Sequence, residues 1–141
     1  DHTQTYLTYN FPNQPAGTTV DFTGWVPPGE TPNPYNTCDA ERVSGTGFNS
    51  ITNPVQVKVL SDGQVAPARA AFGGGLSVKD FLKGYKDQNG NPIELIDSNG
   101  VIHLPDPQTQ AIILFELGVT DTRSSAYDLQ DMVILATIKP V

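Results

Sequence analysis

The feature that most constrains the fold is a pair of apolar runs near the end of the sequence. The first run covers Ala111 to Phe115 and the second covers Met132 to Ile138. Both are rich in β-branched and large apolar residues and are bounded by turn residues, which is typical of strands buried on two faces. We therefore expect two core strands, joined by a polar corner.

Glycine and proline extend this expectation to the whole chain. The 141 residues include 13 glycines and 12 prolines, which lie between apolar segments and form no periodic tract. This spacing favours short strands joined by turns over collagen or disorder. Further strands are predicted at 1–11, 18–26 (with Val20, Phe22 and Trp25 facing inward), 43–51 and 55–59. The sequence predicts one all-β domain over residues 1–141, an antiparallel β-sandwich of jelly-roll or Ig-like type with roughly nine or ten strands.

Local signals mark the turns and one short helix. The segments 87–92 and 97–100 each place Asn-Gly between apolar runs, which predicts hairpins and delimits 93–96 and 101–104 as short paired strands. Ser77 is the predicted N-cap of a helical turn that runs through Lys83, with Asp80 completing a capping box. The alternative for this region is a strand over 82–86.

Composition limits the classes of partner. The net charge of −7 argues against a nucleic-acid partner, because phosphate binding needs clustered Lys and Arg. No apolar stretch reaches the roughly 18 residues that span a bilayer. The chain begins at Asp1 and not at Met, which predicts a secreted form whose signal segment has been removed. The single Cys38 cannot form an internal disulfide; we expect a half-buried thiol, the alternative being a link between subunits.

Catalytic groups are sparse. Nucleophilic catalysis usually needs a histidine base, and the chain has only His2 and His103, with no nucleophile elbow. One cysteine and two distant histidines do not make a zinc site. Glu116 with Asp128 is the one carboxylate pair that a hydrolase hypothesis would use. No second signature supports it, and we predict that the protein is not an enzyme.

The corner between the two apolar runs is acidic. Glu116, Asp121, Asp128 and Asp131 lie there with Arg123 as the only basic residue. Carboxylates brought together repel one another, so such a corner needs a cation, water or an arginine. Calcium binds six to eight oxygen ligands that turns can supply. These four acids are therefore candidate calcium ligands, with a cation-free corner around Arg123 as the alternative.

A second, weaker calcium candidate lies in the first predicted hairpin turn. Asp87, Asn89 and Asn91 have the alternating oxygen spacing of calcium loops. Pro92 stands where such loops need glycine, and no carboxylate occupies the twelfth position. A plain turn explains the same residues, because Asp and Asn before Gly favour hairpin geometry.

The corner also resembles a known family. Phe115-Glu116, a polar loop and the segment 125–134 are similar to the closing signature of a calcium-associated β-domain of bacterial surface and adhesin proteins. That signature reads Phe-Glu-Asp, a loop, then Ser-Asp-x-Asp-aromatic-Asn-Asp and an apolar strand. The resemblance implies that Glu116, Asp128 and Asp131 donate oxygens to a structural calcium. The match is confined to residues 115–134.

The sequence departs from that signature at three positions. Leu117 stands where the third acid belongs, Ala126 replaces the first loop Asp, and Gln130 replaces Asn. Fewer charged ligands imply a weaker calcium site or none.

The start of the chain suggests a role in assembly. Leu7, Tyr9 and Phe11 alternate with Tyr6 and polar residues, which predicts a half-buried strand. Such a strand can complete the sheet of a neighbouring copy, with Tyr6, Leu7, Tyr9 and Phe11 inserted, and a head-to-tail contact of this kind propagates as a fibre. The alternative is pairing within its own domain. We thus predict a secreted, pilus-like structural protein of a filament or surface layer, whose partners are copies of itself.

A binding module is the alternative function. The segment 27–36 has four prolines and is predicted to be an extended surface loop. Trp25 lies just before this segment, and Tyr35 lies within it. Exposed aromatic rings stack on sugar faces. This pattern predicts a calcium-dependent adhesin or carbohydrate-binding module whose partner is a surface glycan or protein.

Overall fold

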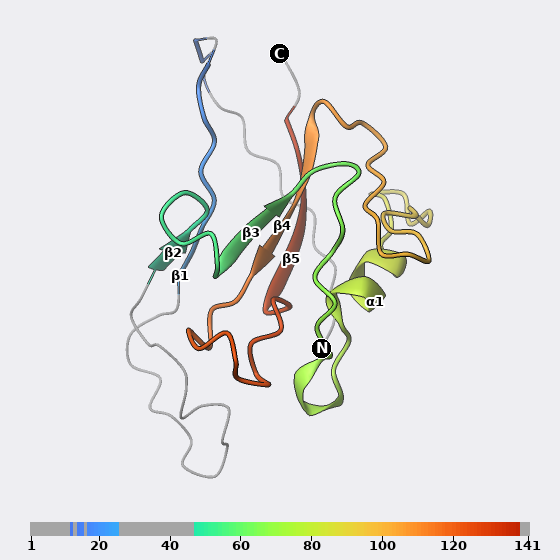
Figure 1. Ribbon diagram of the computed structural model, residues 1–141. Coiled ribbons are helices and arrows are strands. Elements are labelled where there is room, and N and C mark those ends of the chain that lie inside the picture. Colours follow the sequence, from blue (N-terminus) through green and yellow to red (C-terminus); the bar gives the residue numbers. More distant parts are fainter. Residues whose placement is uncertain (1–11, 13, 16, 26–46, 139–141) are drawn as a thin grey trace.

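The computed structural model describes residues 12, 14, 15, 17–25 and 47–138. Within these residues the chain is all-β with one short helix, which confirms the predicted class (Figure 1). The elements are β1 (Thr23–Trp25), β2 (Gly47–Asn49), β3 (Val57–Leu60), the 3-10 turn η2 (Phe72–Gly74), α1 (Val78–Lys83), β4 (Gln110–Phe115) and β5 (Met132–Thr137). They form an antiparallel β1-β2 pair and an antiparallel sheet of order β3-β4-β5. The sandwich architecture and the larger strand number stay predictions.

The sheet of β3, β4 and β5 is the centre of the described structure. β4 lies between the other two strands, with Ile113 paired to Val59 on one side and to Ile134 on the other. Ile112 to Phe115 are fully buried, so the expectation of a core strand buried on two faces is confirmed for β4. β5 is only half-buried along its middle residues, because among the described residues it pairs with β4 alone.

Each face of this sheet carries its own hydrophobic cluster. Ile112 and Leu114 point to one face, where they pack with Val78 and Leu82 of α1 and with apolar residues of 95–104. The alternate residues of β4, Ile113 and Phe115, point to the other face and pack with Phe48 of β2 and Val57. This alternation follows from the two-residue period of a strand. The sheet is therefore covered by α1 and the turns on one face and by the β1-β2 pair on the other.

The β1-β2 pair sits close to β4 because of a glycine. The expectation that Val20 and Trp25 face inward is wrong: Val20 is 37% exposed and Trp25 is 56% exposed. Gly24 is the buried residue of β1. A Cβ at this position would lie 2.6 Å from Phe115 Cδ1 and 2.7 Å from Leu117 Cδ2, so only glycine permits this approach.

The predicted helix and turns are present. α1 begins after the N-cap Ser77, whose hydroxyl accepts the Asp80 N–H while the Asp80 side chain accepts the Ser77 N–H; the capping box is confirmed. Gly90 and Gly100 adopt φ values of 84° and 86° in the two Asn-Gly turns. The strands predicted at 93–96 and 101–104 are reduced to an isolated bridge between Ile96 and Ile102.

Several predicted features lie outside the described residues. These are the strand at 1–11 with Tyr6, Leu7, Tyr9 and Phe11, the proline-rich segment 27–36 with Tyr35, and Cys38. In the part of the chain that is described, no helix has the length and apolar character needed to cross a bilayer.

Candidate functional site

The acidic corner is built around Glu116, which directly follows β4. Its side chain is buried, with 1% of the residue exposed. Four backbone N–H groups donate to its carboxyl group: those of Gly118 (3.2 Å) and Val119 (3.1 Å) to Oε1, and those of Asp128 (2.9 Å) and Leu129 (3.2 Å) to Oε2. Glu116 thus joins the loop that leaves β4 to the loop that enters β5.

Two further carboxylates of the corner are held in the same way. Asp131 Oδ2 accepts the N–H groups of Leu117 (2.6 Å) and Gly118 (3.1 Å). Buried Asp128 uses Oδ2 to accept the Phe72 N–H (3.0 Å) and the Gln130 side-chain amide (2.6 Å). Backbone N–H groups carry a partial positive charge, which stabilises carboxylates. The three acids are therefore satisfied mainly by backbone N–H groups, with the Gln130 side chain as a further donor to Asp128.

The proximity of Asp131 changes the acidity of Glu116. Both side chains accept the same Gly118 N–H, so the two carboxyl groups are neighbours. Burial, and then the charge of Asp131, raise the pKa of Glu116 to about 7, against the opposing effect of the Leu129 and Asp128 N–H groups. Burial and then the nearby Glu116 charge also raise the pKa of Tyr127. Near neutral pH, Glu116 is therefore a titrating group inside the corner.

Asp121 and Arg123 form a separate pair. The Arg123 Nε donates to Asp121 Oδ1 at 3.0 Å, and its second guanidinium nitrogen donates to Oδ2 at 3.1 Å. Their hydrogen bond lowers the pKa of Asp121, and both side chains are largely exposed. Of the four acids predicted to act together, the structure thus brings Glu116, Asp128 and Asp131 into one hydrogen-bonded corner and places Asp121 in a surface ion pair.

The oxygens of this corner are the ones that calcium would use. Calcium prefers carboxylate and carbonyl oxygens, so the residue types fit the ion. Glu116, Asp128 and Asp131 direct these oxygens at N–H groups, and in the described part of the chain no three His, Cys, Asp or Glu side chains are grouped as metal ligands. Calcium at this corner stays a prediction.

The weaker calcium candidate is organised as a turn. Asp87 Oδ1 accepts the N–H groups of Asn89 and Asn91, each at 2.8 Å, and its Oδ2 accepts the Asn91 side-chain amide at 2.9 Å. These bonds lower the pKa of Asp87. The oxygen spacing noticed in the sequence is accounted for by local turn geometry.

The other candidate residues are dispersed. Trp25 lies on β1 with its side chain largely exposed. His103 Nε2 lies 3.4 Å from Asp97 Oδ2 at the second Asn-Gly turn. Glu116 and Asp128, the pair of the hydrolase hypothesis, are linked through the Asp128 N–H and are both buried, at 1% and 4% exposure.

One feature that the sequence pattern did not reveal is that β5 lies at the edge of its sheet among the residues that the structure describes. The Ile138 N–H donates to the Thr109 carbonyl at 2.8 Å, so the backbone of Ile138 faces the strand that β5 pairs with. Because successive residues of a strand face opposite edges, the backbone groups of Val133, Leu135 and Thr137 face away from β4. Lys58 and the short length of β3 protect the opposite edge of the sheet, whereas β5 carries no charge over its six residues.

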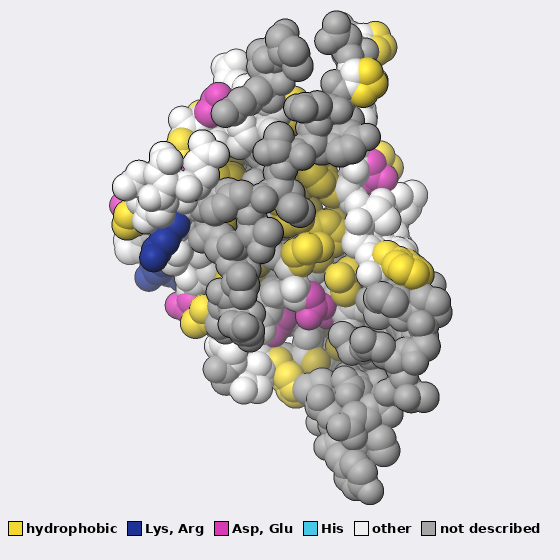
Figure 2. Space-filling view, turned by 180° about the vertical axis from the view of Figure 1, so that it is seen from behind, with side chains coloured by type: hydrophobic (Ala, Val, Ile, Leu, Met, Phe, Trp, Pro, Cys, Tyr) yellow, Lys and Arg dark blue, Asp and Glu magenta, His cyan; other side chains and the backbone are white. Residues whose placement is uncertain are grey.

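The same region is apolar at the surface. Val133 and Leu135 are partly buried against one hydrophobic cluster, and Ile134 and Ala136 against the other. Met132 and Ile138, at the two ends, are 38% and 56% exposed. Figure 2 shows hydrophobic side chains gathered in the middle of the back face, directly above a group of acidic side chains. In the sequence, such an edge strand is visible only as a long uncharged run. Whether that strand lies at the edge or in the middle of a sheet depends on pairing between distant segments.

Comparisons with protein-family models, with curated proteins and with solved structures found no match for this chain.

Proposed function

We propose that this chain is a secreted structural subunit that assembles into an extracellular filament or surface layer by β-strand addition. The edge of β5 is the proposed acceptor, and residues 1–11 of a neighbouring copy are the proposed donor. The supporting observation is the uncharged edge of β5, with outward-facing backbone groups at Val133, Leu135 and Thr137.

The edge has the chemistry that strand addition requires. Main-chain hydrogen bonds to outward-facing N–H and C=O groups supply affinity, and side-chain contacts on the two faces supply specificity. Val133 and Leu135 on one face of β5, and Ile134 and Ala136 on the other, are only partly buried. Both faces therefore have apolar surface that an added strand can cover. An added strand extends both hydrophobic clusters at once.

The predicted donor matches this acceptor. Leu7, Tyr9 and Phe11 give the strand one bulky apolar face, and Tyr6 lies on the opposite face. In this proposal, the added strand and the two described sheets together form the β-sandwich. A donor on one side of a subunit and an acceptor on another make a heterologous contact, which continues into an open fibre.

The test is to remove the donor and then to return it as a peptide. We expect the full chain to assemble in electron micrographs and in sedimentation, and the chain lacking residues 1–11 to sediment as a monomer. A synthetic peptide of residues 1–11 should bind that shortened chain. A peptide of the same length with Tyr6, Leu7, Tyr9 and Phe11 replaced by serine is the matched control and should not bind.

Two results would reject the proposal. One is assembly that is unchanged after deletion of residues 1–11. The other is a full chain that remains monomeric at high concentration, which is the result expected if the first strand pairs within its own domain.

The second candidate function is a calcium-dependent adhesin or carbohydrate-binding module. The exposed ring of Trp25 on β1 favours it, since such rings stack on sugar faces. Calorimetry with calcium and a glycan array test this candidate directly. An array without signal and an absence of binding heat would remove it.

A further inference from the structure

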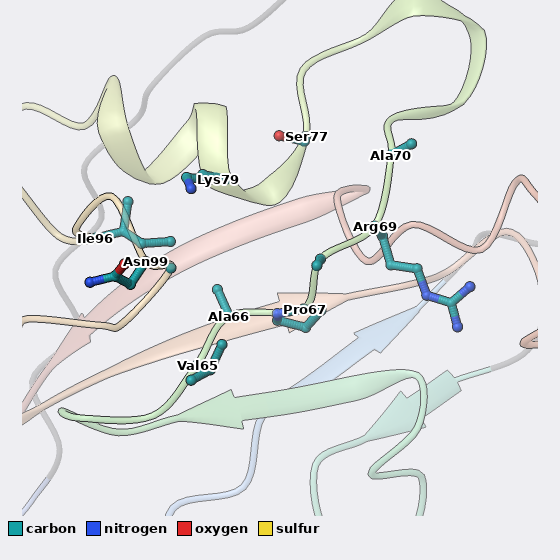
Figure 3. A pocket seen from close by; sticks show the side chains of 11 residues that line it. Val65, Ala66, Pro67, Arg69, Ala70, Ser77, Lys79, Ile96 and Asn99 are labelled. Carbon is teal, nitrogen blue, oxygen red and sulfur yellow. The ribbon is translucent and has the colours of Figure 1, made fainter.

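A groove lies between α1 and the extended segment 65–70, on the face of the sheet that α1 covers (Figure 3). Its cavity volume is about 320 Å³, within the range of small-molecule sites. The walls are made by Val65, Ala66, Pro67, Ala68, Arg69, Ala70, Ser77, Lys79, Ile96, Asn99 and Gly100. Most of these side chains are small and apolar, so the groove offers an apolar surface to a compact ligand.

The charge of this groove differs from that of the chain. The sequence has 15 acidic and 8 basic residues, yet the lining contains no acid and two of the bases, Lys79 and Arg69. A groove lined by one sign of charge concentrates ions of the opposite sign. Two carboxylates lie next to the lining, because Asp80 accepts the Ser77 hydroxyl at 2.6 Å and Asp97 accepts the Asn99 N–H at 2.8 Å, so the place for an anion in the groove is beside Lys79.

The two bases occupy different ends of the groove. In Figure 3 the Lys79 side chain lies on the α1 side of the groove, whereas the Arg69 guanidinium extends away from it. The guanidinium of Arg69 donates to the Thr122 carbonyl at 3.1 Å and stacks over the Tyr127 ring, 5.2 Å from its centroid. Arg69 thus contributes mainly its aliphatic stem.

Lys79 is the residue positioned to meet an anion. Its side chain is half-buried, and its Nζ donates one hydrogen bond, to the Ser98 carbonyl at 2.9 Å. An ammonium group has three donors, so the carbonyl orients it and leaves donors for a ligand. A single ammonium fits one carboxylate better than the several charges of a polyphosphate.

We propose that this groove binds a small organic carboxylate with a compact apolar body. The carboxylate accepts hydrogen bonds from the Lys79 ammonium. The apolar body packs on Ala66, Pro67 and Ile96. This site is separate from the β5 edge and does not depend on assembly.

The test compares one acid with its neutral analogue on the full chain. Saturation-transfer NMR observes the ligand and works on monomers and on assemblies alike. We expect cyclohexanecarboxylate to bind and cyclohexanecarboxamide, which has the same ring and no charge, to bind at least tenfold more weakly. Raised salt should weaken binding of the acid, because the lysine is partly exposed.

Two variants locate the binding site. Lys79→Gln should weaken binding of cyclohexanecarboxylate about tenfold, as expected for loss of a hydrogen bond to a charged group. Lys83→Gln changes the net charge equally on the same helix but lies outside the groove, and it should leave binding unchanged. Equal binding of the acid and the amide, no binding of the acid, or equal effects of the two variants would overturn the proposal.

Two further arms identify the source of the carboxylate. Glucuronate represents an acidic sugar and N-acetylglutamate represents an acidic peptide side chain. Tighter binding of N-acetylglutamate, lost in Lys79→Gln, supports the site and assigns the source to an acidic peptide side chain, whereas tighter binding of glucuronate would contradict the apolar body of the ligand. Binding of either one that persists in Lys79→Gln argues against the site.

Discussion

At the scale of single residues, Glu116 makes stability depend on pH near neutrality. Its pKa is raised from 4.5 to about 7 in the folded chain, by burial and by Asp131. Because the folded chain holds the Glu116 proton more tightly than the unfolded chain does, the protonated side chain stabilises the fold. This contribution to stability is fully present below pH 4.5 and is lost as pH rises towards 7. The shift corresponds to roughly 3 kcal/mol. We expect the free energy of unfolding, measured with denaturant, to fall between pH 5 and pH 8.

Glu116→Gln is the variant that isolates this group. A glutamine must point its NH2 group at two of the N–H donors that now face the carboxyl oxygens, so it should cost about 2 kcal/mol at pH 5. It should also flatten the slope between pH 5 and pH 8. The lowered pKa values of acids such as Asp80 and Asp97 act below about pH 4 and do not interfere. An unchanged slope in this variant would assign the titration to another group.

Gly24 is the second residue whose role can be tested alone. In Gly24→Ala the new Cβ would lie 2.6 Å from the Phe115 ring, so the β1-β2 pair must move away from β4. Overpacking of this kind costs about 1–3 kcal/mol. Gly47→Ala, in the paired strand β2, has its nearest contact at 3.6 Å and is the control. Thermal unfolding should separate the two variants, and similar melting temperatures would show that the close approach to β4 is not needed.

At the scale of elements, α1 depends on its cap. With six residues the helix is too short to be stable by its own propensity. Ser77→Ala removes the hydroxyl that accepts the Asp80 N–H and should cost about 1 kcal/mol. Val78 and Leu82 are buried in one hydrophobic cluster, so the loss should appear in cooperative unfolding of the whole chain. The exposed Ser125→Ala is the control, and an equal loss there would argue against the cap.

The elements differ in how far their sequences predicted them. The capping box at Ser77 and the Asn-Gly turns depend on neighbouring residues, and they were found at the predicted positions. The core strand at 111–115 was predicted because its residues are apolar on both faces. The inward face of β1 was misjudged, because Gly24 is buried by a contact with Phe115 that no local pattern contains. The same holds for the amides that bind Glu116.

At the scale of the whole molecule, the acidic corner links β4 and β5 through hydrogen bonds between carboxylates and backbone N–H groups. Glu116 binds N–H groups from both loops, and Asp131 binds two more. We therefore expect that a chelator such as EDTA leaves the melting temperature unchanged, since the carboxylates are already stabilised by amides. The control is the same scan with added calcium. A fall of several degrees with EDTA, restored by calcium, would instead support the calcium-dependent module.

Assembly is the property of the whole molecule that one substitution at the β5 edge can test. Thr137 has outward-facing backbone groups, and its Oγ1 accepts a hydrogen bond from the Gln110 side chain at 3.1 Å. Thr137→Pro removes the outward N–H and that side-chain bond, whereas Thr137→Val removes only the side-chain bond. Proline at an edge leaves the ladder to β4 intact, because its missing N–H faced outward.

The two variants at Thr137 separate assembly from stability. Both lose the hydroxyl and should show similar, small losses in melting temperature. Only Thr137→Pro should prevent sedimentation of assemblies and weaken binding of the peptide of residues 1–11, by tenfold or more, because an added strand loses a main-chain hydrogen bond and meets the proline ring. If both variants assemble as the parent chain does, then the subunits do not join along β5 and the contact lies on another surface.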